Sequence, residues 1–185
     1  MLDAAEATLL EEGYCALTSR RIAECVGVKQ RLVYDHFQTM DELIVETFRR
    51  MSLREVERMR MSLDAPMPLR ELWDVCIHTT DSRLVAEFMA LAHRIEDLRH
   101  EVVHFIEESR RIQAEAVSRI LGAPQAIAPL DADGLALLAS RVALALTREQ
   151  AIGADKGHGP LLALVERFLD KVEPRPSCPD RMPSR

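Results

Sequence analysis

Apolar residues recur three or four positions apart along most of this 185-residue chain, and this periodicity constrains the fold more than any other feature. The spacing is that of one face of an α-helix, and no segment alternates apolar and polar residues as a half-buried strand would. Only seven glycines interrupt the chain, so long helices can form without breaks. The sequence therefore predicts an all-α fold.

Capping and breaking residues set the expected helix ends. Thr18 can cap a short helix that Gly27 ends, and Thr39-Met40-Asp41-Glu42 has the pattern of a capping box. Pro66 and Pro68 end the long helix that follows. The expected helices span about residues 2–12, 19–26, 30–37, 40–63, 69–79, 82–97, 99–121, 132–152 and 159–172.

The same signals predict two domains and a tail. A three-helix N-terminal domain is expected over residues 1–48, and a larger helical domain over residues 49–173. Residues 174–185 contain four prolines and little apolar surface to bury, so we expect a disordered tail.

The charge distribution and the cysteine content indicate which binding partners and which cellular compartment to expect. The net charge is −6, yet the stretch from Thr18 to Phe37 has four basic and two acidic residues, against 20 basic and 28 acidic residues elsewhere. A locally basic segment on an acidic chain suits a protein that touches DNA at one edge. The chain has no apolar run long enough to span a membrane, and because its first residues include no basic segment before an apolar one, we expect no signal peptide. Its four cysteines form no CxxC pair, so we expect a cytoplasmic protein.

The segment Thr18–Phe37 has the pattern of a helix-turn-helix. Ala23 supplies a small residue where two helices cross, Gly27 supplies the turn, and Val28 and Val33 fill the space between the helices. The second helix of such a motif enters the major groove, and its outward residues must include hydrogen-bond donors. A plain helical hairpin would have the same apolar spacing without this polar face.

Several stretches resemble the TetR family of transcriptional repressors. They are Leu17–Val28, Val33-Tyr34-Asp35-His36-Phe37 and Asp41-Glu42-Leu43, within a match from about Leu2 to Phe48. The resemblance implies an N-terminal DNA-binding domain followed by a domain that binds an effector and dimerises. It also implies double-stranded operator DNA, a small-molecule effector and a second copy of the chain as partners, with no cofactor and no enzymatic activity.

The resemblance also assigns roles to individual residues. Ser19 and Tyr34 would contact phosphate, while Arg20, Gln30 and Arg31 would read base edges. His36 would support the helix or meet the DNA backbone. Lys29, Leu32 and Met40 depart from the family's usual residues, and Leu32 would contact a thymine methyl group or be buried. The expected DNA-binding residues are Ser19, Arg20, Lys29, Gln30, Arg31, Leu32, Tyr34 and His36.

The second domain offers two further sets of candidate residues. Helical faces near the C-terminus predict an isologous dimer interface through Leu138, Val142, Leu146, Leu162, Val165 and Leu169. A mostly apolar effector site is expected from Trp73, Ile77, Phe88, Met89, Ala92, His93, Val103 and Ile106. The expected effector is apolar or aromatic, with at most one hydrogen-bonding group near His93. The alternative is a plain core, because a set of Trp, Phe and Met residues at helical spacing is more often core than ligand site.

Other readings of the sequence are weaker. Glu96, His100 and His104 lie at helical spacing, but nothing completes a metal site, so no bound metal is expected. An all-helical carrier of small molecules is the main alternative function, and the outward Arg20, Gln30, Arg31 and Tyr34 argue against it. A helical enzyme is disfavoured because phosphate-binding loops and nucleophile motifs are absent. The sequence does not distinguish repression from activation.

Overall fold

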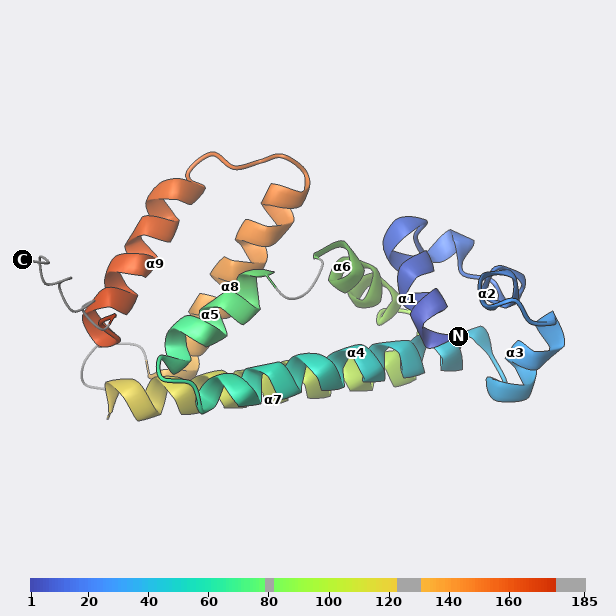
Figure 1. The fold of residues 1–185 in the computed structure, drawn as a ribbon, viewed down its shortest axis with the longest axis horizontal. Helices are drawn as coiled ribbons and strands as arrows, with labels where there is room; N and C mark the ends of the chain where they lie inside the picture. Colours follow the sequence, from blue (N-terminus) through green and yellow to red (C-terminus); the bar gives the residue numbers. More distant parts are fainter. Residues whose placement is uncertain (79–81, 123–130, 176–185) are drawn as a thin grey trace, which may run out of the picture.

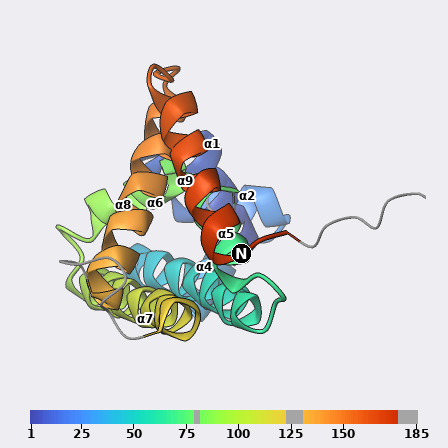
Figure 2. The ribbon, with the colours of Figure 1, turned by 90° about the vertical axis from the view of Figure 1, so that its left-hand side faces the viewer.

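The computed structural model describes residues 1–78, 82–122 and 131–175, and all regular structure within these ranges is helical, as the sequence predicted. The molecule is elongated, with α1 to α3 at one end, and α4 and α7 run side by side along its length (Figure 1). Viewed along α4 and α7, helices α8 and α9 rise from the other end (Figure 2). The helices are α1 (Leu2–Glu11), α2 (Ser19–Val26), α3 (Gln30–His36), α4 (Met40–Leu63), α5 (Pro68–His78), α6 (Ser82–Leu91), α7 (Glu96–Leu121), α8 (Ala132–Ala151) and α9 (His158–Val172), with one 3₁₀ turn at Tyr14–Ala16.

The ends of α2 follow directly from its flanking residues. The Thr18 Oγ1 atom accepts a hydrogen bond from the Arg21 N–H at 3.1 Å and caps the first turn. Gly27 adopts a left-handed conformation with φ 70°, which allows the Val28 N–H to donate to the Ala23 carbonyl at 2.9 Å. Both ends of this helix were correctly predicted.

The start of α4 has half of the expected capping box. The Thr39 hydroxyl accepts from the Glu42 N–H at 3.0 Å, as predicted. The Glu42 carboxylate does not return to the Thr39 N–H but accepts from the Gln38 N–H at 2.6 Å. The reciprocal contact has moved one residue outward, because the extended chain before α4 presents the Gln38 N–H to Glu42.

The boundary between α6 and α7 was wrongly predicted. One helix was expected over residues 82–97, whereas α6 ends at Leu91 and α7 begins at Glu96. Ile95 is extended, with φ −105° and ψ 109°, and no Gly or Pro marks this turn. Leu91, Ala92 and Ile95 are all buried in the core. Packing against neighbouring helices therefore sets the turn, and no local breaker residue does.

One hydrophobic core continues across the domain boundary expected at residue 48. It joins α1 and α2 to α6 and α7 through α4, whose Leu43, Ile44 and Phe48 are at most 3% exposed. Phe48 packs edge to face on Phe88 of α6, with ring centroids 5.2 Å apart. The boundary thus falls inside a continuous helix and inside a shared core.

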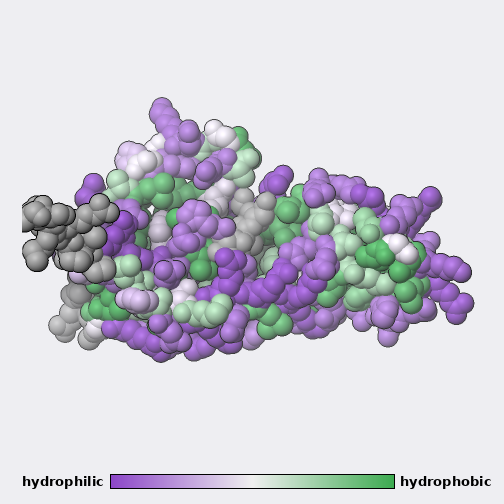
Figure 3. Space-filling view, viewed as in Figure 1, coloured by the Kyte–Doolittle hydropathy of each residue, from purple (hydrophilic) through white to green (hydrophobic). Residues whose placement is uncertain are grey.

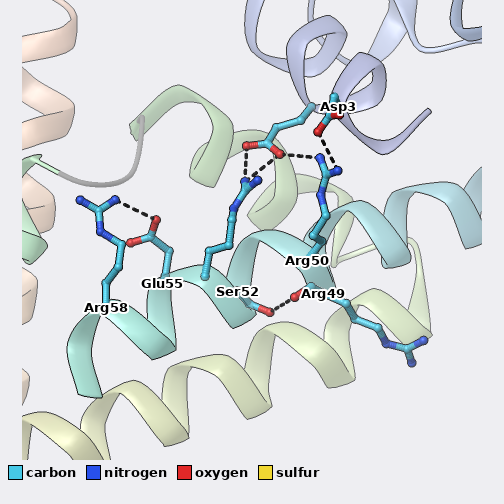
Figure 4. Close-up of polar contacts among 8 residues, drawn as sticks. Asp3, Arg49, Arg50, Ser52, Glu55 and Arg58 are labelled. Carbon is cyan, nitrogen blue, oxygen red and sulfur yellow. Dashed lines mark hydrogen bonds and ion pairs between the residues drawn. The ribbon is translucent and has the colours of Figure 1, made fainter. Parts of the chain in front are cut away.

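Polar contacts attach α1 to α4, and the residue that follows α9 to α5. On α4, Arg50 contacts Asp3 at 2.7 Å, and Arg54 contacts Glu6 of α1 at 2.6 Å (Figure 4). At the other end, the buried Glu173 carboxylate accepts hydrogen bonds from the N–H groups of Leu69 and Arg70, at 2.9 and 3.0 Å. A residue after α9 therefore caps α5.

Of the expected tail, only residues 174 and 175 lie within the described residues, so the disorder expected for residues 174–185 falls largely outside them.

Candidate nucleic-acid interface and ligand cavity

Helices α2 and α3 form a compact pair at one end of the molecule. Ala23 of α2 is 3% exposed and Val33 of α3 is 1% exposed, and both belong to the same core cluster. Val28, in the turn, packs against this cluster. The small side chain at Ala23 lets the two helices approach closely, which is the geometry that a helix-turn-helix requires.

The polar residues of this pair point outward. The side chains of Arg20 and Arg31 are 81% and 91% exposed. Each is paired with an acidic residue of its own helix: Arg20 Nε lies 2.9 Å from Glu24, and Arg31 Nε lies 4.0 Å from Asp35. Exposed pairs of this kind are weak, so both guanidinium groups can exchange their partners for DNA. Arg21, by contrast, is turned toward Glu12 at 2.6 Å and belongs to the packing of α1 on α2.

Ser19, Gln30 and Tyr34 form a hydrogen-bonded chain across the two helices. The Gln30 Nε2 atom donates to the Ser19 hydroxyl at 2.8 Å, and that hydroxyl donates to the Tyr34 phenol oxygen at 3.0 Å. Ser19 is only 5% exposed, whereas Tyr34 is 50% exposed. Ser19 therefore orients two exposed neighbours, and the Tyr34 hydroxyl keeps its own proton to donate outward.

The other three expected DNA-binding residues also lie on the outside. Lys29 precedes α3 and His36 ends it, and both are exposed. Leu32 is 38% exposed, so of the two expectations for this residue the structure favours an apolar contact over burial. Seven of the eight expected residues are thus exposed, and the eighth, Ser19, is buried between Gln30 and Tyr34.

A cavity of about 240 Å³ lies between α4, α5, α6, α7 and α8, and we call it the inner cavity. Apolar side chains form much of its wall, among them Phe48, Met51, Phe88, Met89 and Phe105. Phe48 contacts Phe105 edge to face at 5.9 Å as well as Phe88. This wall is contiguous with the hydrophobic core, so a ligand here would replace core contacts.

Polar groups line another part of the inner cavity. Glu55, on α4, is 6% exposed, and one of its carboxylate oxygens lies 3.9 Å from Arg58 (Figure 4). The Gln113 Nε2 atom donates to Cys76 Sγ at 3.5 Å. Burial, with a smaller contribution from the charge of Glu55, raises the pKa of the Cys76 thiol to about 11, so the thiol stays protonated at neutral pH. The Ser109 hydroxyl is buried without a hydrogen-bond partner among the described residues.

The structure separates the eight expected effector residues. Phe88, Met89 and Ile106 line the inner cavity, and Trp73 lines a second depression described below. Ile77, Ala92, His93 and Val103 line neither; Ala92 is core, while His93 and Val103 face outward. The polar groups of the inner cavity instead include Glu55, Ser109, Gln113 and the arginines of α7 and α8. These residues are scattered over three helices and have no common sequence spacing that would have singled them out.

The second depression, the outer groove, has a volume of about 390 Å³ and is bounded by α5, α7, α8 and α9. Hydrophobic residues gather between α8 and α9, whereas the surface along α4 is largely hydrophilic (Figure 3). Of the expected dimer residues, Leu138, Val142, Val165 and Leu169 line the groove. Leu138 and Leu162 are 51% and 37% exposed, but Leu146 and Leu169 are already buried within one protomer. Leu164, 55% exposed, lines the groove and was missed by the sequence analysis.

The described ranges offer neither a metal site nor a membrane-spanning helix. Within them, no group of three or more His, Cys, Asp or Glu side chains is arranged to hold a metal ion, and Glu96 pairs with Arg99 at 2.9 Å. Nor does any helix in those ranges combine the length and apolarity needed to cross a bilayer.

Comparisons with known proteins agree with this geometry. Residues 1–47 match the family described as "Bacterial regulatory proteins, tetR family". A comparison with curated proteins gives no match.

Solved structures resemble the whole chain in fold. A transcriptional regulator from Rhodococcus sp. Rha1 has a TM-score of 0.70 at 19% identity, over 95% of this chain and 96% of the other. The transcriptional regulator FadR from Bacillus subtilis, in complex with stearoyl-CoA, has a TM-score of 0.65 at 17% identity, over 93% and 95%. A structure from Saccharomonospora viridis, provisionally assigned as a transcriptional regulator and solved with choline, has a TM-score of 0.74 at 16% identity, over 92% and 91%. Residues 1–47 of this chain are therefore similar to the tetR family of bacterial regulatory proteins, and the chain as a whole shares the fold of these solved transcriptional regulators.

Proposed function

We propose that this protein is a transcriptional repressor that binds double-stranded operator DNA as a homodimer and leaves it when a small molecule with an apolar body binds. The observation that carries the proposal is the exposed face of α2 and α3, where Arg20, Gln30, Arg31 and Tyr34 lie together on a domain of the tetR family. A carrier of small molecules would need no such face. In this role α3 enters the major groove and α2 crosses the backbone.

The proposed dimer forms through α8 and α9. Leu138 and Leu164 are more than half exposed and line an apolar groove, and exposed apolar surface of this kind is typical of a protein interface. A second copy that inserts its own α8 and α9 would cover both grooves at once, as an isologous interface requires. Two recognition helices held about 34 Å apart would then meet successive major grooves.

The inner cavity is the proposed effector site, because its wall reaches the DNA-binding end. Phe88 and Met89 of α6 line the cavity, and α6 also packs against α1. Close to this contact, a Cβ atom at Gly13 would lie 3.7 Å from the Glu87 carboxylate. A ligand that displaces α6 would therefore move α1 and, through the shared core, α2 and α3. The continuous α4 is a second connection between the cavity and the DNA-binding helices.

The experiment that tests the proposal begins by selecting bound sequences from random double-stranded DNA. We expect a palindromic consensus with half-sites one helical turn apart, bound by one dimer. The affinities of the Phe88→Leu and Met89→Ala variants, which alter the cavity wall, are then measured by titration with the selected DNA. Enrichment of no sequence would contradict the DNA-binding role. If a monomer binds the selected DNA as tightly as the dimer does, the proposed dimer is contradicted.

A further inference from the structure

Three arginines around the inner cavity lack a carboxylate partner among the residues that the structure describes. Most arginines of the described ranges are paired with an acidic residue, as on α4, where Arg49, Arg50 and Arg54 all have partners within 2.8 Å. Arg110 of α7 and Arg141 and Arg148 of α8 are different: within these ranges they form no hydrogen bond or ion pair through their side chains. In a chain with a net charge of −6, such unpaired cations gathered at one place need an explanation.

The spacing of α8 turns two of these arginines toward the same cavity. Arg141, Leu144 and Arg148 are three, four and seven positions apart, so they share one helical face, and all three line the inner cavity. Leu138 and Val142 lie on a different face and line the outer groove. Helix α8 therefore presents a cationic face to the inner cavity and an apolar face to the outer groove.

The charge balance of the inner cavity is positive. Its one lining carboxylate, Glu55, lies beside Arg58, which is outside the cavity wall. The three unpaired arginines have no such compensation. The apolar residues Phe48, Phe88 and Met89 line the same cavity from α4 and α6. The cavity thus combines apolar side chains of α4, α6 and α7 with the cationic side chains of α7 and α8.

From this arrangement we infer that the effector is an amphipathic anion, with its apolar body against Phe48, Phe88 and Met89 and its anionic group against Arg110, Arg141 and Arg148. The inference rests on the proposed function, since it names the ligand class of the proposed effector site. A carboxylate or a phosphate accepts two hydrogen bonds from one guanidinium group, which makes arginine well suited to both. This inference revises the sequence-based expectation of an apolar or aromatic effector with at most one hydrogen-bonding group near His93.

The test compares three probes of equal chain length: decanoate, decanol and decyltrimethylammonium. Calorimetric titration of the full-length protein, below the micelle-forming concentration of each probe, measures the affinities. We expect decanoate to bind at least about tenfold more tightly than decanol, and the ammonium probe to bind most weakly. The decanoate affinity should fall with added salt, while the decanol affinity should not.

Variants then assign the difference to the arginines. Arg141→Gln and Arg148→Gln should each weaken decanoate binding about three- to tenfold and leave decanol binding unchanged, because both side chains are exposed and their charges are partly screened. Arg167→Gln is the matched control: Arg167, on α9, is also exposed and unpaired among the described residues, but lines neither cavity. It should leave the affinities of all three probes unchanged.

The outcomes separate the ligand class from the proposed function. Equal affinities for decanoate and decanol, preferred binding of the ammonium probe, binding of no probe, or equal effects of Arg167→Gln and Arg141→Gln would each overturn the inference. If decanol or the ammonium probe still releases the selected DNA, the effector site stands and only its charge preference is wrong. If the protein selects no DNA sequence at all, the proposed function fails, whichever probe binds.

Discussion

At the scale of single residues, Arg31 and Tyr34 share the exposed face of α3 but suit different parts of DNA. Arg31 is almost fully exposed and can form a bidentate contact with a guanine edge, whereas the Tyr34 hydroxyl is suited to a phosphate oxygen. Arg31→Ala should cost about 1–3 kcal/mol for each half-site and relax the preference at one base pair. Tyr34→Phe should weaken binding to selected and random DNA about equally. Titrations with both kinds of DNA measure the two effects.

The salt dependence supplies the control for this comparison. Since Tyr34 is neutral, Tyr34→Phe should leave the salt slope of binding almost unchanged. Arg167→Ala, far along the chain on α9, should change neither the affinity nor the sequence preference. Full retention of affinity and preference by Arg31→Ala would exclude α3 as the reading helix.

At the scale of elements, the cap on α5 depends on a residue 104 positions away. The Glu173 carboxylate satisfies the backbone N–H groups of Leu69 and Arg70, and both Leu69 and Glu173 are buried. Glu173→Ala would leave these donors without a partner and should lower the free energy of unfolding by about 1–3 kcal/mol. Urea denaturation measures this decrease in the free energy of unfolding. Glu166→Ala, which removes an exposed partner of Arg70, should cost less than about 1 kcal/mol; equal effects would contradict the capping role.

The contact between α4 and α7 should depend on pH. Hydrogen bonds from Arg111 and then Arg60 lower the pKa of Glu108 to about 2. In the unfolded chain a Glu has a pKa of about 4.3. The contribution of Glu108 to stability is therefore full above about pH 4.3 and is lost as the pH falls toward 2. Glu108→Gln should destabilise the protein in urea at pH 7 by more than it does at pH 3. If the free energy of unfolding of the variant differs from that of the wild type by the same amount at both pH values, this ionic contribution is contradicted.

At the scale of the whole molecule, the outer groove should decide the oligomeric state. Leu138→Glu or Leu164→Glu would place a charge on each side of the proposed interface and should cost about 3 kcal/mol or more of dimer stability. Light scattering should then show a monomer with normal helix content and weak binding to the selected DNA. Leu53→Glu is the control, because Leu53 is 69% exposed on α4 and lines neither cavity. A wild-type monomer at micromolar concentration would remove the basis for this interface.

The sequence by itself determined those features that depend on neighbouring residues. The helical class, both ends of α2 and the start of α4 follow from periodicity, from Thr18 and Thr39 as caps and from Gly27 as a turn, because caps and turns act within a few residues. The candidate DNA-binding residues are also close in sequence, so the pattern of α2 and α3 was enough to propose them.

Only the tertiary structure decided what depends on distant residues. The turn between α6 and α7 exists because Leu91 and Ile95 are buried against other helices. Leu146 and Leu169 have the periodicity of an interface but are buried within one protomer. The inner cavity brings Glu55, Ser109 and Arg148 together from three helices. Helical spacing shows which residues share a face, but packing between helices determines what that face contacts, and it is this packing that placed the unpaired arginines around one cavity.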